Sequence, residues 1–127
     1  MFDAFRLKAF ARININNYND MNTQYINRVE LQGRVGTVRI SCVCETVVAS
    51  FSVLTERSYK TGDGHQVVEA TWMSIAAFEG DDVNIKGLTR GSLVHLTGCL
   101  RNNKYIDASG NERVFTEVIA TSLKVLE

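Results

Sequence analysis

Two strand-like runs joined by a short glycine-containing loop constrain the fold of this chain more than any other feature. The first run, residues 47–55, is rich in Val, Phe and Thr, and the second, 67–78, alternates with a period of two. Between them, residues 58–66 (SYKTGDGHQ) carry two glycines and an aspartate, which favour a turn or a flexible finger. The stretch therefore predicts a β-hairpin with a protruding tip.

The alternation of the second run sorts its side chains onto two faces. One face is expected to carry Val68, Ala70, Trp72, Ser74, Ala76 and Phe78. The two large aromatic side chains on this face, Trp72 and Phe78, have only small residues between them. A flat ring with Ser or Ala beside it leaves room for a planar guest. We interpret this face as a stacking shelf with a basic, mobile finger next to it.

Composition excludes several classes of function. The chain of 127 residues is long enough for one domain with its own core, and 14 basic residues balance 14 acidic ones. This balance excludes an indiscriminate polycation but leaves a local basic patch open. Cys42, Cys44 and Cys99 show no metal-site spacing with His65 or His95, so we expect no cofactor and reduced cysteines in or near a strand core.

The sequence does not predict an enzyme or a membrane protein. No Ser-His-Asp or Cys-His constellation and no phosphate-cradling glycine motif can be assembled from it. No apolar run reaches the length needed to cross a membrane. Together with the expected reduced cysteines, this favours a cytoplasmic protein.

Residues 1–26 differ from the rest of the chain. The segment MFDAFRLKAFAR favours a short amphipathic helix, and INNYNDMNTQY follows as a polar, Asn-rich link. Three interpretations stay open: a transit peptide, which Asp3 and a missing cleavage pattern weaken; an arm that docks on a partner; and, most simply, an extension upstream of a working start at Met21. The domain itself is expected at 27–127.

The remaining residues read as strand after strand. Residues 28–38 alternate, with Gly33 and Gly36 suited to a bulge, and 38–44 either continue this strand or pair again at its edge. Strands are also expected at 92–101 and 113–125, with a second protruding hairpin at 102–111.

A short helix is expected between the third and fourth strands. In residues 79–91, Asp81 is suited to the N-cap position, and the apolar residues Val83, Ile85 and Leu88 are followed by a closing glycine. Five strands with one helix in this position predict an all-β fold, a five-stranded OB-fold Greek-key barrel.

With these elements in place, the sequence resembles the bacterial single-stranded DNA-binding protein family. The matching stretches are NRVELQGRVG (27–36), ASFSVLTERSY (49–59), ATWMSIAAF (70–78), TRGSLVHLTGCLR (89–101) and KYIDASGNERVFTEVIA (104–120). No single stretch is specific, but their order and number are. The resemblance implies four aromatic side chains that stack with bases, which fall here on Tyr59, Trp72, Phe78 and Tyr105. It also implies basic partners for phosphates, at Lys60, Arg90, Arg101 and Lys104, with Arg34, Arg57 and Lys86 as further candidates.

The sequence also departs from the family pattern. Met73 replaces a histidine common next to the subunit contact, so we expect a homotetramer but keep a dimer as the second choice. The family's long forms end in an acidic tip that recruits other replication proteins, whereas this sequence ends at Glu127, directly after the last expected strand. Recruitment by that route is therefore not expected. Sequences without this tip also resemble primosomal replication protein N, a dimeric relative.

These observations predict sequence-independent binding of single-stranded DNA, in replication, recombination or repair. Bases would stack on the aromatic rings while Lys and Arg neutralise phosphates. The main alternative is a protein-interaction module of a primosome or replisome, since OB-folds also hold peptides and other subunits. Single-stranded RNA is a further alternative ligand, because the sequence does not reveal contacts to a 2′-hydroxyl.

Overall fold

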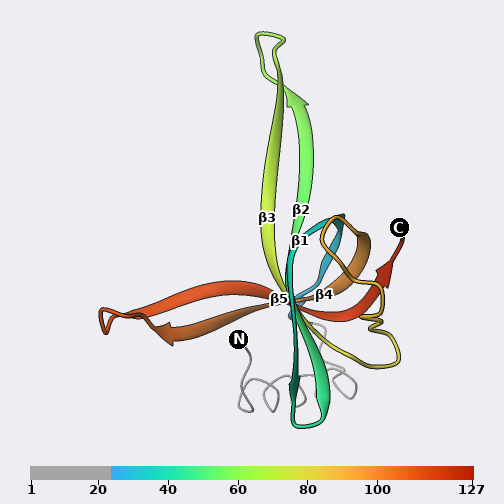
Figure 1. The fold of residues 1–127 in the computed structure, drawn as a ribbon. Helices are drawn as coiled ribbons and strands as arrows, with labels where there is room; N and C mark the ends of the chain where they lie inside the picture. Colours follow the sequence, from blue (N-terminus) through green and yellow to red (C-terminus); the bar gives the residue numbers. More distant parts are fainter. Residues whose placement is uncertain (1–23) are drawn as a thin grey trace.

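Period-two alternation over five segments produces five long β-strands in the computed structural model, which describes residues 24–127. The strands are β1 (Val29–Val43), β2 (Thr46–Lys60), β3 (Gln66–Phe78), β4 (Leu93–Ile106) and β5 (Glu112–Val125) (Figure 1). They close into a barrel in the order β1-β2-β3-β5-β4, in which only the β3–β5 pair is parallel. This all-β closed barrel agrees with the OB-fold expected from the sequence.

The barrel encloses the main hydrophobic core. Inward-pointing side chains from all five strands fill it, including Val35, Phe51, Val53, Ile75, Val94, Leu96, Val118 and Leu123. Each large apolar side chain buried in this way contributes about 1.5–3 kcal/mol to folding. On β3 the buried side chain of Ile75 packs in this core, with Met73 against it, while Trp72 and Ser74 are exposed, so the predicted alternation of this strand is confirmed.

β1 is bent so that it can pair with two different strands. Its first part, up to Arg34, pairs with β4, and the part from Arg34 to Val43 pairs with β2. The register with β2 shifts between Val35 and Val38, at a bulge that contains Gly36. The predicted bulge is therefore present. Of the two alternatives left open for residues 38–44, the structure shows the first, since β1 continues without interruption to Val43.

The helix expected between the third and fourth strands is absent from the described residues, so that prediction was wrong. Residues 79–92 instead form successive turns, in which Leu88 N–H donates to Ile85 O and Ser92 N–H donates to Thr89 O. Two features of the sequence explain this outcome. Gly87 and Gly91 adopt positive φ angles, and the Asn84 side chain accepts a hydrogen bond from Lys86 N–H, which competes with helical pairing.

These turns are nevertheless anchored to the barrel by the same apolar residues that suggested a helix. Val83, Ile85 and Leu88 are all buried in the main core. Val83 also forms short bridges with Gly80 and with Leu123 of β5. The segment therefore closes one end of the barrel without helical hydrogen bonds.

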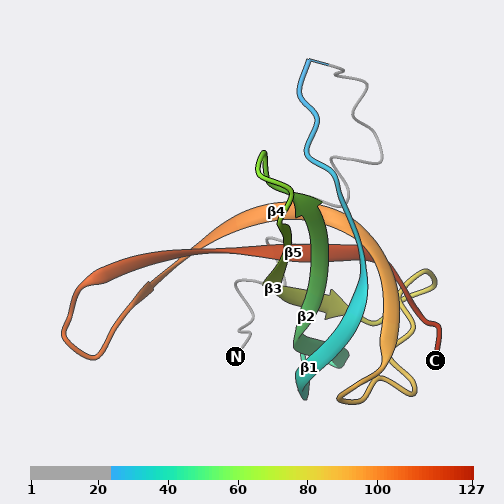
Figure 2. The same ribbon diagram turned by 90° about the horizontal axis from the view of Figure 1, so that it is seen from above.

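Two hairpins extend beyond the barrel as long arms. We call residues 54–72, the outer parts of β2 and β3, the β2–β3 arm, and residues 100–118, the outer parts of β4 and β5, the β4–β5 arm. They leave the barrel in different directions, as the two views show (Figures 1 and 2). The flexible finger expected at 58–66 is much shorter than predicted, because strand pairing continues to Lys60 and Gln66. The second protruding hairpin is confirmed.

The third hairpin, between β1 and β2, carries two of the three cysteines at its tip. Cys44 and Glu45 form its two-residue turn, and both have positive φ angles. Cys42 and Cys44 are exposed, whereas Cys99 is half-buried, and all three thiols are free. The prediction that the cysteines lie in or near the strand core was thus wrong for the two at this tip.

Candidate nucleic-acid interface

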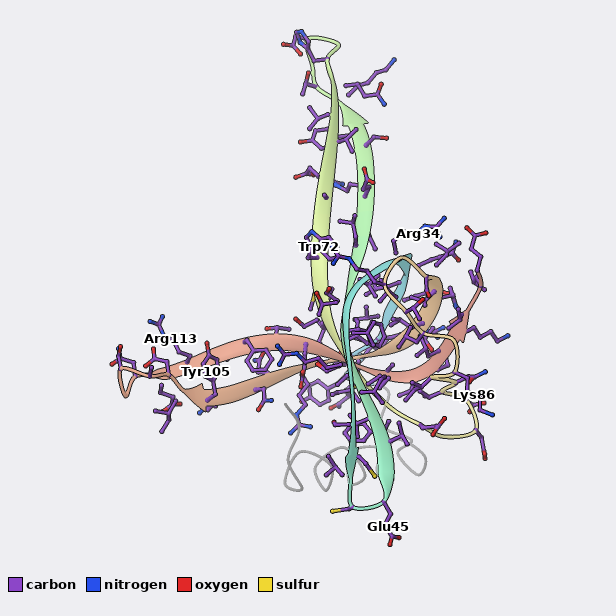
Figure 3. All side chains as sticks on the ribbon, viewed as in Figure 1. Arg34, Glu45, Trp72, Lys86, Tyr105 and Arg113 are labelled. Atoms are coloured by element: carbon purple, nitrogen blue, oxygen red, sulfur yellow. The ribbon has the colours of Figure 1, made fainter. Side chains whose placement is uncertain are left out.

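The indole ring of Trp72 is held on the outer wall of the barrel, at the base of the β2–β3 arm (Figure 3). The side chain is 57% exposed. One edge of the ring lies directly over Gly36, where an added Cβ would come within 2.8 Å of the indole. The absence of a side chain at Gly36 therefore lets the edge of the ring approach the wall, while more than half of the Trp72 side chain stays exposed.

An open hollow of about 400 Å³ lies next to this ring. Its lining consists of Gly36, Thr37, Ser52, Trp72 and Arg90. Arg90 reaches this place because the turn segment is attached to β1: Gly91 N–H donates to Val35 O over 2.8 Å. The structure thus brings an aromatic face and a cationic side chain together at one site.

Sequence reasoning had selected Trp72 and Arg90 separately, but it missed the three small residues between them. The only available signal was Gly36, which the sequence indicated as a bulge position but not as a residue in contact with the Trp72 ring.

Phe78 lies on the same outer face of β3 as Trp72, as the alternation predicted, but its surroundings differ. Its side chain is only 6% exposed and belongs to a second apolar cluster with Val48, Ala76 and Ile119. Stacking on a base requires an accessible ring face. The arrangement of this chain therefore does not favour the predicted stacking role of Phe78, and it gives the ring a packing role.

Tyr59 lies in the outer part of the β2–β3 arm, on the opposite face from Trp72. Residues directly across an antiparallel ladder share a face; Tyr59 pairs with Val67, whereas Trp72 pairs with Leu54. The Tyr59 side chain is 40% exposed. The guanidinium of Arg57 lies over its ring, 4.9 Å from the centroid. The structure therefore does not place Tyr59 on the same shelf as Trp72.

The β4–β5 arm carries its own aromatic pair. Tyr105 is 49% exposed and meets the ring of Phe115 edge to face, with the centroids 5.7 Å apart. Arg101 and Arg113 lie on the same face as these two rings. Arg101 is four residues before Tyr105 on β4, and Arg113 lies directly across from Tyr105 on β5. Sequence reasoning missed Phe115, although its position in an alternating strand next to a hairpin tip was a usable signal.

The candidate phosphate-binding side chains are spread over the barrel and both arms. Three of them are paired with carboxylates: Arg34 with Glu127 at 2.7 Å, Arg57 with Glu69 at 3.0 Å, and Lys104 with Glu112 at 3.4 Å. Lys60, Lys86 and Arg90 are exposed and form no ion pair within residues 24–127. Arg101 is half-buried, and among the described residues its Nη1 atom is buried without a hydrogen-bond partner.

Titratable groups near the arms are perturbed in ways that the geometry explains. The hydroxyl of Thr61, followed by His65, donates hydrogen bonds that lower the pKa of Asp63 at the tip of the β2–β3 arm. The Arg113 guanidinium, followed by Asn111 N–H, lowers the pKa of Asp107 at the tip of the β4–β5 arm. Burial raises the pKa of the Cys99 thiol, partly offset by the nearby Arg101 charge.

The described residues show neither a metal site nor a membrane span. No group of three or more His, Cys, Asp or Glu side chains between residues 24 and 127 is arranged to hold a metal ion. The same part of the chain contains no helix long and apolar enough to cross a lipid bilayer.

A small closed β-barrel that presents an exposed aromatic ring, a cation beside it and two aromatic arms defines the class of OB-fold nucleic-acid-binding domains. Within this class, the single-strand binding protein family matches residues 26–126. The chain belongs to this family.

Individual relatives agree with this assignment. The single-stranded DNA-binding protein of Neisseria meningitidis is 30% identical over 105 residues, which cover 80% of this chain and 60% of that protein. The mitochondrial single-stranded DNA-binding protein of Danio rerio is 28% identical and covers 94% of this chain and 89% of that protein. The chain thus spans about 60% of the length of the Neisseria relative.

A solved structure also matches. A Plasmodium falciparum SSB in complex with ssDNA superimposes with a TM-score of 0.71 at 25% identity. The superposition covers 84% of this chain and 100% of the Plasmodium chain.

Proposed function

We propose that this chain binds single-stranded DNA with little dependence on base sequence. The observation that carries the proposal is the exposed Trp72 indole, seated over Gly36 with Arg90 across the adjacent hollow. Every base has a π face, so an indole can stack on any of them, with about 1–3 kcal/mol per stacked base. The neighbouring guanidinium then neutralises a phosphate of the same strand.

The arms extend this site on both sides. Tyr59 on one arm and Tyr105 on the other offer further stacking surfaces, and Lys60, Lys86, Arg101 and Lys104 offer further charges. Because Tyr59 faces the side of its arm opposite Trp72, a strand that stacks on both rings has to pass around the β2–β3 arm. The relatives named single-stranded DNA-binding proteins, and the Plasmodium complex with ssDNA, support this ligand. Duplex DNA hides its base faces and is expected to bind weakly.

The wider role follows from the same proposal. We assign DNA binding to residues 27–127, which agrees with the start of the family match at residue 26, and we treat residues 1–26 as an extension. Protection of single strands in replication, recombination or repair, in the cytoplasm, is the corresponding cellular role. Assembly as a homotetramer through the outer face of β1, with a dimer as second choice, would bring several short sites together. Light scattering on the purified protein tests the assembly.

The decisive experiment is a titration of intrinsic fluorescence with an oligo-dT strand at low and high salt. The sequence contains one tryptophan, so the signal reports on Trp72 when excitation is chosen at the long-wavelength edge, where the four tyrosines do not absorb. We expect saturable quenching, with an affinity that falls as salt rises because phosphate contacts release counterions. A hairpin duplex of equal charge serves as the control and is expected to quench little.

Other outcomes would change the assignment. Absence of quenching at either salt concentration would contradict DNA stacking on Trp72 and favour the protein-interaction module. Tighter binding of an oligo-U strand than of oligo-dT would make RNA the preferred ligand.

A further inference from the structure

The ring of Tyr59 is covered on one face by a cation of its own strand. Arg57 and Tyr59 are two residues apart on β2 and so point to the same side of the β2–β3 arm. The guanidinium carbon of Arg57 lies 4.9 Å from the ring centroid, a cation–π geometry. A base that stacks on this face must first displace the guanidinium.

Glu69 holds the guanidinium in this position. It lies directly opposite Arg57 in the β2–β3 ladder, and Arg57 Nε donates to Glu69 Oε1 over 3.0 Å. The side chains of Arg57 and Glu69 are 74% and 50% exposed, so water screens their attraction. The pair is thus fixed in place by strand register but weak enough to exchange with another anion.

A DNA phosphate is a suitable competitor for this guanidinium. It accepts two parallel hydrogen bonds from arginine, as a carboxylate does, and a strand brings further phosphates and bases at the same time. When the guanidinium turns to a phosphate, the covered face of Tyr59 becomes available for a base. The carboxylate that it leaves is half exposed and can be solvated.

We propose that Glu69 is a positioning residue that competes with the phosphate of a bound strand for Arg57. In the free arm, Glu69 keeps Arg57 over Tyr59; in the bound arm, Arg57 contacts a phosphate and the ring stacks on a base. This inference rests on the proposed function and deepens it.

The other ion pairs lack this combination. Arg34 bonds Gly91 O as well as Glu127, which makes it a clamp between β1 and its neighbours. Lys104 Nζ and Glu112 Oε1 are 3.4 Å apart, and within the described residues Lys104 does not lie over an aromatic ring. Within residues 24–127, only Glu69 joins a carboxylate to a cation that already lies over a candidate stacking ring.

The test compares Glu69→Gln with the parent by fluorescence anisotropy of a labelled oligo-dT strand over a range of salt concentrations. We expect the variant to bind about two- to fivefold more tightly at low salt, the range set by one exposed ion pair. In the parent, the vacated carboxylate takes up a counterion and partly offsets the release from DNA. The slope of log K against log salt should therefore be steeper in the variant, by up to about 0.7.

A matched control is available on the same arm. Glu56 lies opposite Ala70 on the other face and forms no ion pair within the described residues, so Glu56→Gln removes the same charge without freeing a cation. We expect its effect on affinity to stay below about twofold. In the double variant Arg57→Gln/Glu69→Gln, the gain from Glu69→Gln should disappear relative to Arg57→Gln alone.

The outcomes separate this inference from the proposed function. If the parent does not bind oligo-dT at all, the proposed function fails. If the parent binds but Glu69→Gln shows unchanged or weaker affinity and an unchanged slope, the competition by Glu69 is disproved while the proposed function stands. An equal gain from Glu56→Gln would also disprove it, because the effect would then be general electrostatics.

Discussion

The two arms of this molecule have the same tip but support their aromatic rings in different ways. In each tip, a residue bonds the residue four positions later: Thr61 N–H donates to His65 O over 2.8 Å, and Asp107 N–H donates to Asn111 O over 3.0 Å. Each tip also has a glycine with positive φ in its fourth position, Gly64 or Gly110. The backbone of the two loops is therefore equivalent, and only the side chains distinguish them.

The rings behind these tips have different neighbours. On the β4–β5 arm, Tyr105 packs edge to face on Phe115, an aromatic contact that salt does not screen. On the β2–β3 arm, Tyr59 is covered by Arg57, which an exposed ion pair keeps in place. One ring is thus held by packing and the other by charge. We expect the first arm to contribute to binding at every salt concentration and the second to respond to salt.

The largest expected effect on DNA affinity comes from Trp72, on the outer wall of the barrel. Trp72→Ala removes the stacking surface that both arms flank, and we expect it to weaken oligo-dT binding by about 1–3 kcal/mol, or roughly five- to 150-fold. The side chain is 57% exposed, so stability should change little. Anisotropy with a labelled strand measures the affinity, and thermal melting followed by circular dichroism checks the fold. If the folded variant binds oligo-dT as tightly as the parent, Trp72 is not a stacking surface for DNA.

The next effect compares the arms directly. Tyr105→Ala should weaken binding by about 1–2 kcal/mol at low and high salt alike, because it removes one stacked ring. Tyr59→Ala should cost less at low salt, since without the ring no cation–π contact has to be broken when Arg57 turns from Glu69 to a phosphate. Both variants are titrated with the same strand over the same salt range. Identical losses with identical salt dependence would show that the two arms do not differ in the proposed way.

These differences show which parts of the site sequence patterns can predict. Alternation predicted the strands, the barrel and the outward position of Trp72, because period two depends only on neighbouring residues. It could not predict that Arg90 lies beside Trp72, since this requires the turn segment to attach to β1 beyond the bulge. The family resemblance added Tyr59 as a stacking ring, whereas the register puts this ring on the face of the arm opposite Trp72.

The burial of Phe78 and the missing helix have related explanations. Phe78 has the outward position that alternation predicts, but this part of β3 pairs with β5, and Ile119 and Val48 surround the ring. Alternation assigns a face and does not reveal what packs on it. The turn segment has the apolar spacing of a short helix, but backbone conformations at Gly87 and Gly91 favour turns. Local patterns therefore predicted correctly toward which face a side chain points, but they did not predict its contacts with residues far away in the sequence.

A smaller effect tests whether packing supports the β4–β5 ring. Phe115→Ala removes the partner of Tyr105 and should weaken binding by about 0.5–1.5 kcal/mol, the range for an edge-to-face pair. Val114→Ala is the matched control, because Val114 is exposed on the opposite face of the same strand and should leave the affinity unchanged. If both variants bind equally well, Tyr105 does not depend on its aromatic neighbour. Phe115→Leu keeps most of the apolar volume, so its affinity should lie between those of Phe115→Ala and Val114→Ala.

The smallest effect concerns the tips and appears only in acid. The pKa values of Asp107 and Asp63 are both lowered from 3.8 in the folded chain, so their carboxylates stabilise the loops above that pH. This contribution is lost as pH falls through the folded pKa values, below 3.8. The amide resonance of Gly110, followed by NMR from neutral pH downward, should stay constant to about pH 4 and then shift. Asp107→Asn keeps a side-chain oxygen that can accept from the N–H groups of Ser109 and Asn111. It removes the negative charge that pairs with Arg113, so it should loosen the Gly110 tip already at neutral pH. Gly64 in the same variant is the internal control, and a shift there as well would mean that the two tips are not independent.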